Sequence, residues 1–178
     1  MRVYIPATVP MLRALVTDRE IFPVGATAFA VTPALREAYA SGDDEELAEV
    51  AMLEAARASL RLLAAASEDA AAASGAEGEP PSRPIYRRAV IAADVAGAKQ
   101  RPDLDDAVVK LAGPVTYNQI ASVHVDLADA EAEVAKAVDV IDAADLGDAD
   151  AEFVLGDAED HQLAWYAAQE LPFLLDLL

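Results

Sequence analysis

Short runs rich in β-branched and aromatic residues recur along this 178-residue chain, and several of them alternate between apolar and polar positions. A period of two is the pattern of a β-strand with one buried face. The predicted strands cover residues 3–5, 27–31, 88–93, 107–112, 120–127, 152–155 and 163–166. In the 120–127 strand, Val123 and Val125 are expected on one face, with His124 and Asp126 on the other.

A second pattern, with apolar residues three and four positions apart, predicts helices. The clearest covers about 43–65 and begins at Asp43, which lies three residues before Glu46 in the arrangement of a capping box. A second long helix covers about 129–144 and ends before Gly147. Shorter helices are expected at three other places: after Thr8, after Thr32 and over 170–178.

The stretch 66–84 is rich in Ala, Ser, Glu, Gly and Pro. Because it lacks the large apolar side chains that offset the entropy cost of ordering, we predict a flexible surface loop. Neither flank is self-sufficient, so residues 1–178 are expected to form one domain. Strands and helices alternate without regular βαβ spacing. This predicts an α+β domain with a mixed or antiparallel sheet and helices mainly on one face.

Charge is distributed unevenly along the chain. Acidic residues number 32 against 13 basic ones, a formal net charge of −19. Residues 1–101 carry 14 acidic and 11 basic groups, which sum to −3, whereas residues 102–178 carry 18 and 2, which sum to −16. Nucleic acids and anionic membranes are bound mainly through Lys and Arg, so we expect direct binding to neither. A basic protein partner is expected instead.

The densest acidic stretch, 126–160, contains 13 acidic residues and one base, Lys136. Asp129, Glu133 and Asp142 fall outside the apolar stripe of the second long helix and are expected to form a negative face. Our leading hypothesis is a non-enzymatic interaction or regulatory module that docks a basic partner through these carboxylates. The alternative is that the acids only keep the surface solvated.

The two histidines are the candidate groups for metal binding or acid–base chemistry. His124 lies two residues before Asp126 on a predicted strand, and His161 directly follows Asp160. If the strand after His161 pairs beside the strand of His124, these four side chains converge as a divalent metal ion requires. The second hypothesis is therefore a small-molecule or divalent-metal site, with hydrolysis as one outcome. In the simpler interpretation, both histidines are ordinary strand and turn residues.

Other chemistries lack their sequence signatures. The chain has no cysteine, which removes disulfides, thiolate catalysis, cysteine-type zinc sites and iron–sulfur ligation. It has neither a phosphate-binding glycine loop nor a serine-hydrolase motif, so we assign no catalytic residue and expect no cofactor. No uninterrupted apolar run approaches 18 residues and no apolar leader opens the chain, so we expect a cytoplasmic protein.

Arg outnumbers Lys ten to three and Ala, Asp and Glu are abundant, which indicates GC-rich coding of the actinobacterial or halophilic kind. Four phrases then carry a resemblance: RVYIPAT at 2–8, FAVTPALR at 29–36, RPDLDDA at 101–107, and HQLAWY at 161–166 continuing to 170–171. In these segments the chain resembles a family of uncharacterised actinobacterial proteins, which are small, acidic and cytoplasmic. The resemblance extends over the whole chain apart from 66–84. The resemblance implies an actinobacterial cytoplasmic protein and assigns no functional residue.

Overall fold

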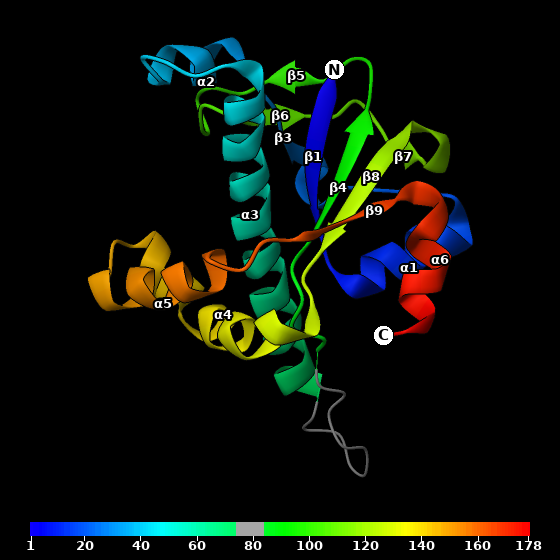
Figure 1. Ribbon diagram of the computed structural model, residues 1–178, viewed down its shortest axis with the longest axis vertical. Helices are drawn as coiled ribbons and strands as arrows, with labels where there is room; N and C mark the ends of the chain where they lie inside the picture. The colour runs from blue at the N-terminus through cyan, green and yellow to red at the C-terminus, as the bar shows by residue number, and fades with distance from the viewer. Residues whose placement is uncertain (74–83) are drawn as a thin grey trace.

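The computed structural model of the protein describes residues 1–73 and 84–178 (Figure 1). The strands are β1 (Arg2–Ala7), β2 (Glu20–Ile21), β3 (Thr27–Phe29), β4 (Ala89–Asp94), β5 (Lys99–Gln100), β6 (Val108–Lys110), β7 (Val115–Thr116), β8 (Ile120–Val125) and β9 (Ala164–Ala167). The helices are α1 (Val9–Asp18), α2 (Pro33–Ala38), α3 (Asp44–Ala73), α4 (Glu131–Asp145), α5 (Ala149–Glu159) and α6 (Leu171–Asp176).

The main sheet is antiparallel throughout, with the strand order β5-β6-β3-β1-β4-β8-β9. β1 and β4 occupy its centre and pair over six residues. β8 pairs with β4 on one side and with β9 on the other, so that His124 lies between Val90 and Trp165. β2 and β7 form a separate two-stranded sheet. The protein is therefore an α+β domain with an antiparallel sheet, which confirms the predicted fold class.

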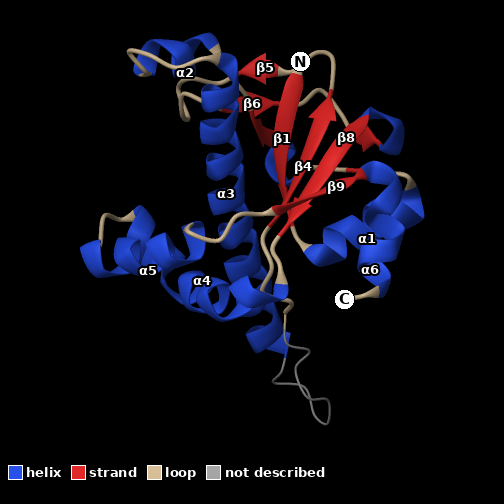
Figure 2. Ribbon diagram, in the orientation of Figure 1, coloured by secondary structure: helices blue, strands red, loops and turns tan. Residues whose placement is uncertain are grey.

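Helices lie on both faces of the main sheet, and most helical residues lie on one of them (Figure 2). On that face α3 packs across the strands, and Leu47 of α3 and Val90 of β4 belong to the same buried apolar cluster. α4 and α5 pack beside α3 around a second apolar cluster that includes Leu60. α1 and α6 cover part of the opposite face, where Leu12 and Leu171 are fully buried. The central strands are consequently buried on both sides.

The helix starts follow the signals expected from the sequence. Thr8 and Thr32 each accept a hydrogen bond from the backbone N–H three residues later, at 3.4 and 3.1 Å. At the start of α3, the Glu46 N–H donates to Asp43 at 2.9 Å and the Asp43 N–H donates to Glu46 at 3.2 Å, which confirms the capping box. α4 ends before Gly147, whose φ of 94° lies in the left-handed region.

The strand predicted over 152–155 is wrong, because these residues lie inside α5. The Asp148 carboxylate accepts a 2.9 Å hydrogen bond from the Ala151 N–H and so caps this helix. Ala151, Leu155 and Ala158 are its buried residues. Their spacing of four and three positions is that of a helix, whereas the short run at 152–155 matched either element.

α3 is also longer than predicted, since it extends from the expected end near residue 65 to Ala73. The added turns are rich in alanine, which has the highest intrinsic helix propensity. The first part of the 66–84 range is therefore helical, and the rest of the predicted loop, at 74–83, lies outside the described residues. Although α3 has 30 residues, neither it nor another helix of the described residues combines the length and apolar character needed to cross a membrane.

Candidate functional site

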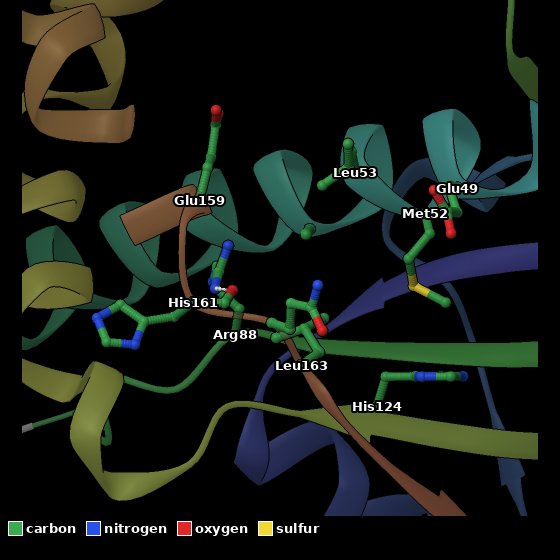
Figure 3. A pocket seen from close by; sticks show the side chains of 10 residues that line it. Glu49, Met52, Leu53, Arg88, His124, Glu159, His161 and Leu163 are labelled. Carbon is green, nitrogen blue, oxygen red and sulfur yellow. Dashed lines mark hydrogen bonds between the residues drawn. The ribbon is translucent and has the colours of Figure 1, made fainter. Parts of the chain in front are cut away.

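A cavity of about 400 Å³ lies between α3, the α3-facing side of β8 with Arg88 just before β4, and the segment 159–163 that leads from the end of α5 to β9 (Figure 3). Alternation along β8 directs Val123 and Val125 into the core shared with α1 and α6, and His124 to the α3 side. Three parts of the chain line the cavity. They are Glu49, Met52, Leu53 and Ala56 of α3; Arg88 just before β4 and His124 of β8; and Glu159, His161, Gln162 and Leu163 of the connecting segment.

His124 is a half-buried residue at one end of the cavity. Its Nε2 atom lies 3.0 Å from Ser122 Oγ, the next side chain on the same face of β8. Burial lowers the pKa of His124 because it disfavours the charged imidazolium, and the positive charge of Arg2 lowers it further. The imidazole is therefore mainly neutral at pH 7, with one nitrogen that donates and one that accepts a hydrogen bond.

His161 lies at the other end of the same cavity. Its Nε2 atom is 3.7 Å from Glu133 Oε2 on α4. Its backbone carbonyl accepts a 2.8 Å hydrogen bond from Arg88 Nη2. Figure 3 shows the imidazoles of His161 and His124 turned away from each other. The structure thus brings the two predicted histidines to one cavity without bringing their rings together.

Asp126 forms a buried ion pair with Arg88. Only 2% of the Arg88 side chain and none of the Asp126 side chain is exposed. The Nε, Nη2 and backbone N–H groups of Arg88 each donate to the Asp126 carboxylate at 2.8 Å. The pair therefore neutralises itself inside the protein. Because Arg88 also holds the carbonyl of His161, it links β4 and β8 to the segment that lines the cavity.

The four residues of the predicted metal site do not come together as one ligand set. Both oxygens of Asp126 are engaged by Arg88, and Asp160 is an exposed residue at the end of α5. The rings of His124 and His161 point apart. In residues 1–73 and 84–178, no group of three or more His, Asp or Glu side chains is placed to hold a metal ion.

Arginines from the first half of the chain neutralise part of the acidic half. Arg57 Nη2 lies 2.8 Å from Glu152 and 3.1 Å from Asp145, while Arg61 Nε lies 2.7 Å from Asp145. The hydrogen bonds to Glu152 and Asp145 hold the pKa of Arg57 above its usual range. Those from Arg61 and Arg57 hold the pKa of Asp145 below its usual range. Arg87 pairs in the same way with Glu131, at 2.8 Å.

The three carboxylates of the predicted docking face do not share one side of α4. Glu133 and Asp142 are nine positions apart, which at about 3.6 residues per turn is two and a half turns, so they lie on opposite sides. Glu133 is directed to His161. Asp129 and Asp142 are exposed and have no side-chain partner among the described residues. Glu133 and Asp142 therefore do not belong to one negative face of α4.

Sequence reasoning missed the α3 wall of the cavity and did not identify Asp126 as the partner of Arg88. A signal for the pair was present. Arg88 directly precedes one apolar strand and Asp126 directly follows another, and these positions become neighbours once the strands pair in antiparallel register, with Ala89 opposite Val125. No comparable local signal identifies Met52 or Leu163 as cavity residues, because their position depends on how α3 and the connecting segment pack.

The fold and the cavity define the class of structure: an antiparallel α+β domain with a cavity between its long helix and its sheet. The chain belongs to a family of unknown function, DUF6912, whose model matches residues 1–175. No curated protein and no solved structure matches the chain. The expected membership in a family without an assigned function is confirmed, and actinobacterial origin stays a prediction.

Proposed function

We propose that the protein binds a small organic molecule in the cavity between α3, β8 and segment 159–163. The cavity itself is the observation that carries this proposal. Its volume of about 400 Å³ falls in the range of about 300–1,000 Å³ that is typical of small-molecule sites. Its lining combines apolar side chains such as Met52, Leu53 and Leu163 with a few polar groups such as His124 and Gln162, which is the usual composition of such sites.

Features around the cavity favour a preformed site. α3 packs firmly on the sheet through Ala51 and Ala55, which are fully buried. The Arg88–Asp126 pair joins the ends of two strands and holds the backbone at His161. A site whose walls are fixed before the ligand arrives loses less conformational entropy on binding.

Hydrolysis is not included in this proposal. Ser122 and His124 are in contact, yet Ser122 is only 6% exposed and does not line the cavity. Within the described residues, no carboxylate bonds to the other nitrogen of His124, so the third member of a nucleophile–base–orienter arrangement is missing. The geometry supports binding without assigning a reaction.

Docking of a basic protein partner is a second candidate. Its support is that Asp129 and Asp142 are exposed and without a counter-charge in the described part of a chain whose net charge is −19. Affinity for such a partner would fall with rising salt, and it would weaken in an Asp129→Asn/Asp142→Asn variant that folds normally. An affinity that does not change with salt or in that variant would argue against docking. Both candidates assume the cytoplasmic location expected from the sequence.

The cavity proposal is tested by screening small metabolites for an increase in melting temperature. Leu53→Trp places a large side chain in the cavity lining, and Leu104→Trp is a matched control in the 101–107 turn, since the two leucines are 55% and 54% exposed. A cavity ligand should stabilise the wild type and Leu104→Trp but not Leu53→Trp. If no compound stabilises the wild type, or if every active compound stabilises both variants equally, the proposal is wrong.

A further inference from the structure

The positive groups that line the cavity are largely compensated within the protein. The guanidinium of Arg88 is neutralised by Asp126 at 2.8 Å. His124 is mainly uncharged at pH 7 because burial lowers its pKa. The imidazole Nε2 of His161 lies 3.7 Å from the Glu133 carboxylate. The described residues that line the cavity therefore offer a bound anion no uncompensated positive charge.

Two carboxylates of the lining are less well compensated. Glu49 is exposed, and its carboxylate has no hydrogen bond or ion pair with any described residue. Glu159 has Arg57 as its ion-pair partner, but at 4.0 Å, and Arg57 is already engaged at shorter distances by Asp145 and Glu152. Figure 3 shows Glu49 and Glu159 at opposite ends of the α3 wall. A concave site edged by one sign of charge concentrates ions of the opposite sign.

Apolar side chains line the cavity between these carboxylates, and one aromatic side chain lies on the same face of the sheet as His124. Met52 and Leu53 belong to the α3 wall between Glu49 and Glu159, and they can cover an apolar ligand body. Trp165 is the single tryptophan of the chain, is 62% exposed, and lies directly opposite His124 in the β8–β9 pairing. Opposite residues of antiparallel strands share a face, and an exposed indole is the most favourable aromatic partner for a cation.

We propose that the ligand of this cavity is an organic cation, with an amine or quaternary ammonium group near Glu49 or Glu159 and an apolar body against Met52 and Leu53. This inference rests on the proposed small-molecule function and adds the charge of the ligand to it. Organic anions of the same shape are disfavoured, because they would bring a negative charge to two carboxylates and to a strongly acidic molecule.

Three probes with the same phenylbutyl body but different charge test the inference: 4-phenylbutylamine, 4-phenylbutanol and 4-phenylbutyrate. Each is titrated into the full chain while the fluorescence of Trp165 and the amide chemical shifts are followed. We expect the amine to bind about tenfold more tightly than the carboxylate, with the alcohol between them, since each carboxylate contributes a modest attraction near the surface. Added salt should reduce the preference for the amine.

Variants separate the charge from the cavity. Glu49→Gln/Glu159→Gln should lower the affinity for the amine to that for the alcohol and leave the alcohol unaffected. Glu68→Gln is the matched control, because Glu68 is an exposed acid further along α3 that does not line the cavity. If the carboxylate binds as tightly as the amine, the charge inference is wrong and the cavity remains a binding site. If none of the probes binds at millimolar concentration, the cation inference fails, whereas the small-molecule proposal is decided by the metabolite screen.

Discussion

Replacing Asp126 by alanine should strongly destabilise the protein. The Asp126 carboxylate is fully buried and accepts three hydrogen bonds from Arg88, each 2.8 Å long. Without it, a guanidinium that is 2% exposed loses its counter-charge and the Arg88 backbone N–H loses its acceptor. Desolvated charges without a partner are among the costliest features a folded protein can contain.

Removing one partner of a buried ion pair costs about 3–5 kcal/mol, whereas a domain of ordinary stability unfolds with about 5–15 kcal/mol. The Asp126→Ala variant should therefore lose a large share of its free energy of unfolding. Urea unfolding followed by circular dichroism measures this loss, provided that the dependence on urea concentration stays that of the wild type.

Two variants distinguish buried charge from other effects. Asp94→Ala removes an ion pair with Arg2 whose side chains are 59% and 48% exposed, and it should cost at most about 1 kcal/mol. Arg88→Met/Asp126→Leu leaves no charge in the interior and should recover part of the loss. The reasoning is refuted if Asp126→Ala costs no more than Asp94→Ala, or if the double variant is no more stable than the single one.

Three further predictions follow from local geometry. Acidification from about pH 7.5 to 5 should destabilise the wild type more than the His124→Gln variant. The pKa of His124 is lower in the folded state than in the unfolded state, so its contribution to the free energy of unfolding is complete above the unfolded pKa of about 6.5 and is lost as the pH falls through the folded pKa. Equal losses of stability in urea unfolding would contradict this. Gly147→Ala should destabilise the protein by about 1–2 kcal/mol, because the φ of Gly147 is 94°. Gly156→Ala inside α5 should stabilise the protein by about 1 kcal/mol, because no atom lies within 4 Å of the added Cβ and alanine favours the helix. Melting-temperature shifts of the same sign for the two variants would be inconsistent with this. Arg57→Ala removes a link between α3 and the α4–α5 pair, so amide exchange should increase in α5 more than in β4, and a uniform increase would argue against it.

The parts of the site that sequence reasoning predicted are local ones. The placement of His124 on the face opposite Val123 and Val125 follows from the period of two in a strand, and β8 has the predicted alternation. The metal-site hypothesis required the strand after His161 to pair beside the strand of His124, and β9 does pair with β8. Each of these features depends on residues within one strand or on two neighbouring strands.

The position of the His161 ring could not be predicted in the same way. It is set by the segment between α5 and β9, which is held by Arg88 at its carbonyl and lies near Glu133 on α4. These contacts join residues 28 and 73 positions apart, counted from 133 to 161 and from 88 to 161. Whether two histidines share a metal ion is decided by such long-range packing, because strand periodicity fixes only the face of a side chain and not its direction within the fold.

The charge pattern shows the same limit and bears on function. Part of the acidic half of the sequence is neutralised in the molecule, because α3 and the segment before β4 place Arg57 and Arg87 against carboxylates of α4 and α5. What remains uncompensated includes Glu49, which comes from the nearly neutral first half, and Glu159, whose arginine is shared with two other acids. Both line the cavity. The charge that bears most directly on ligand binding therefore lies where the two halves of the sequence meet in space, and this is why we place the recognition of a cation at the cavity and not on the exposed carboxylates Asp129 and Asp142.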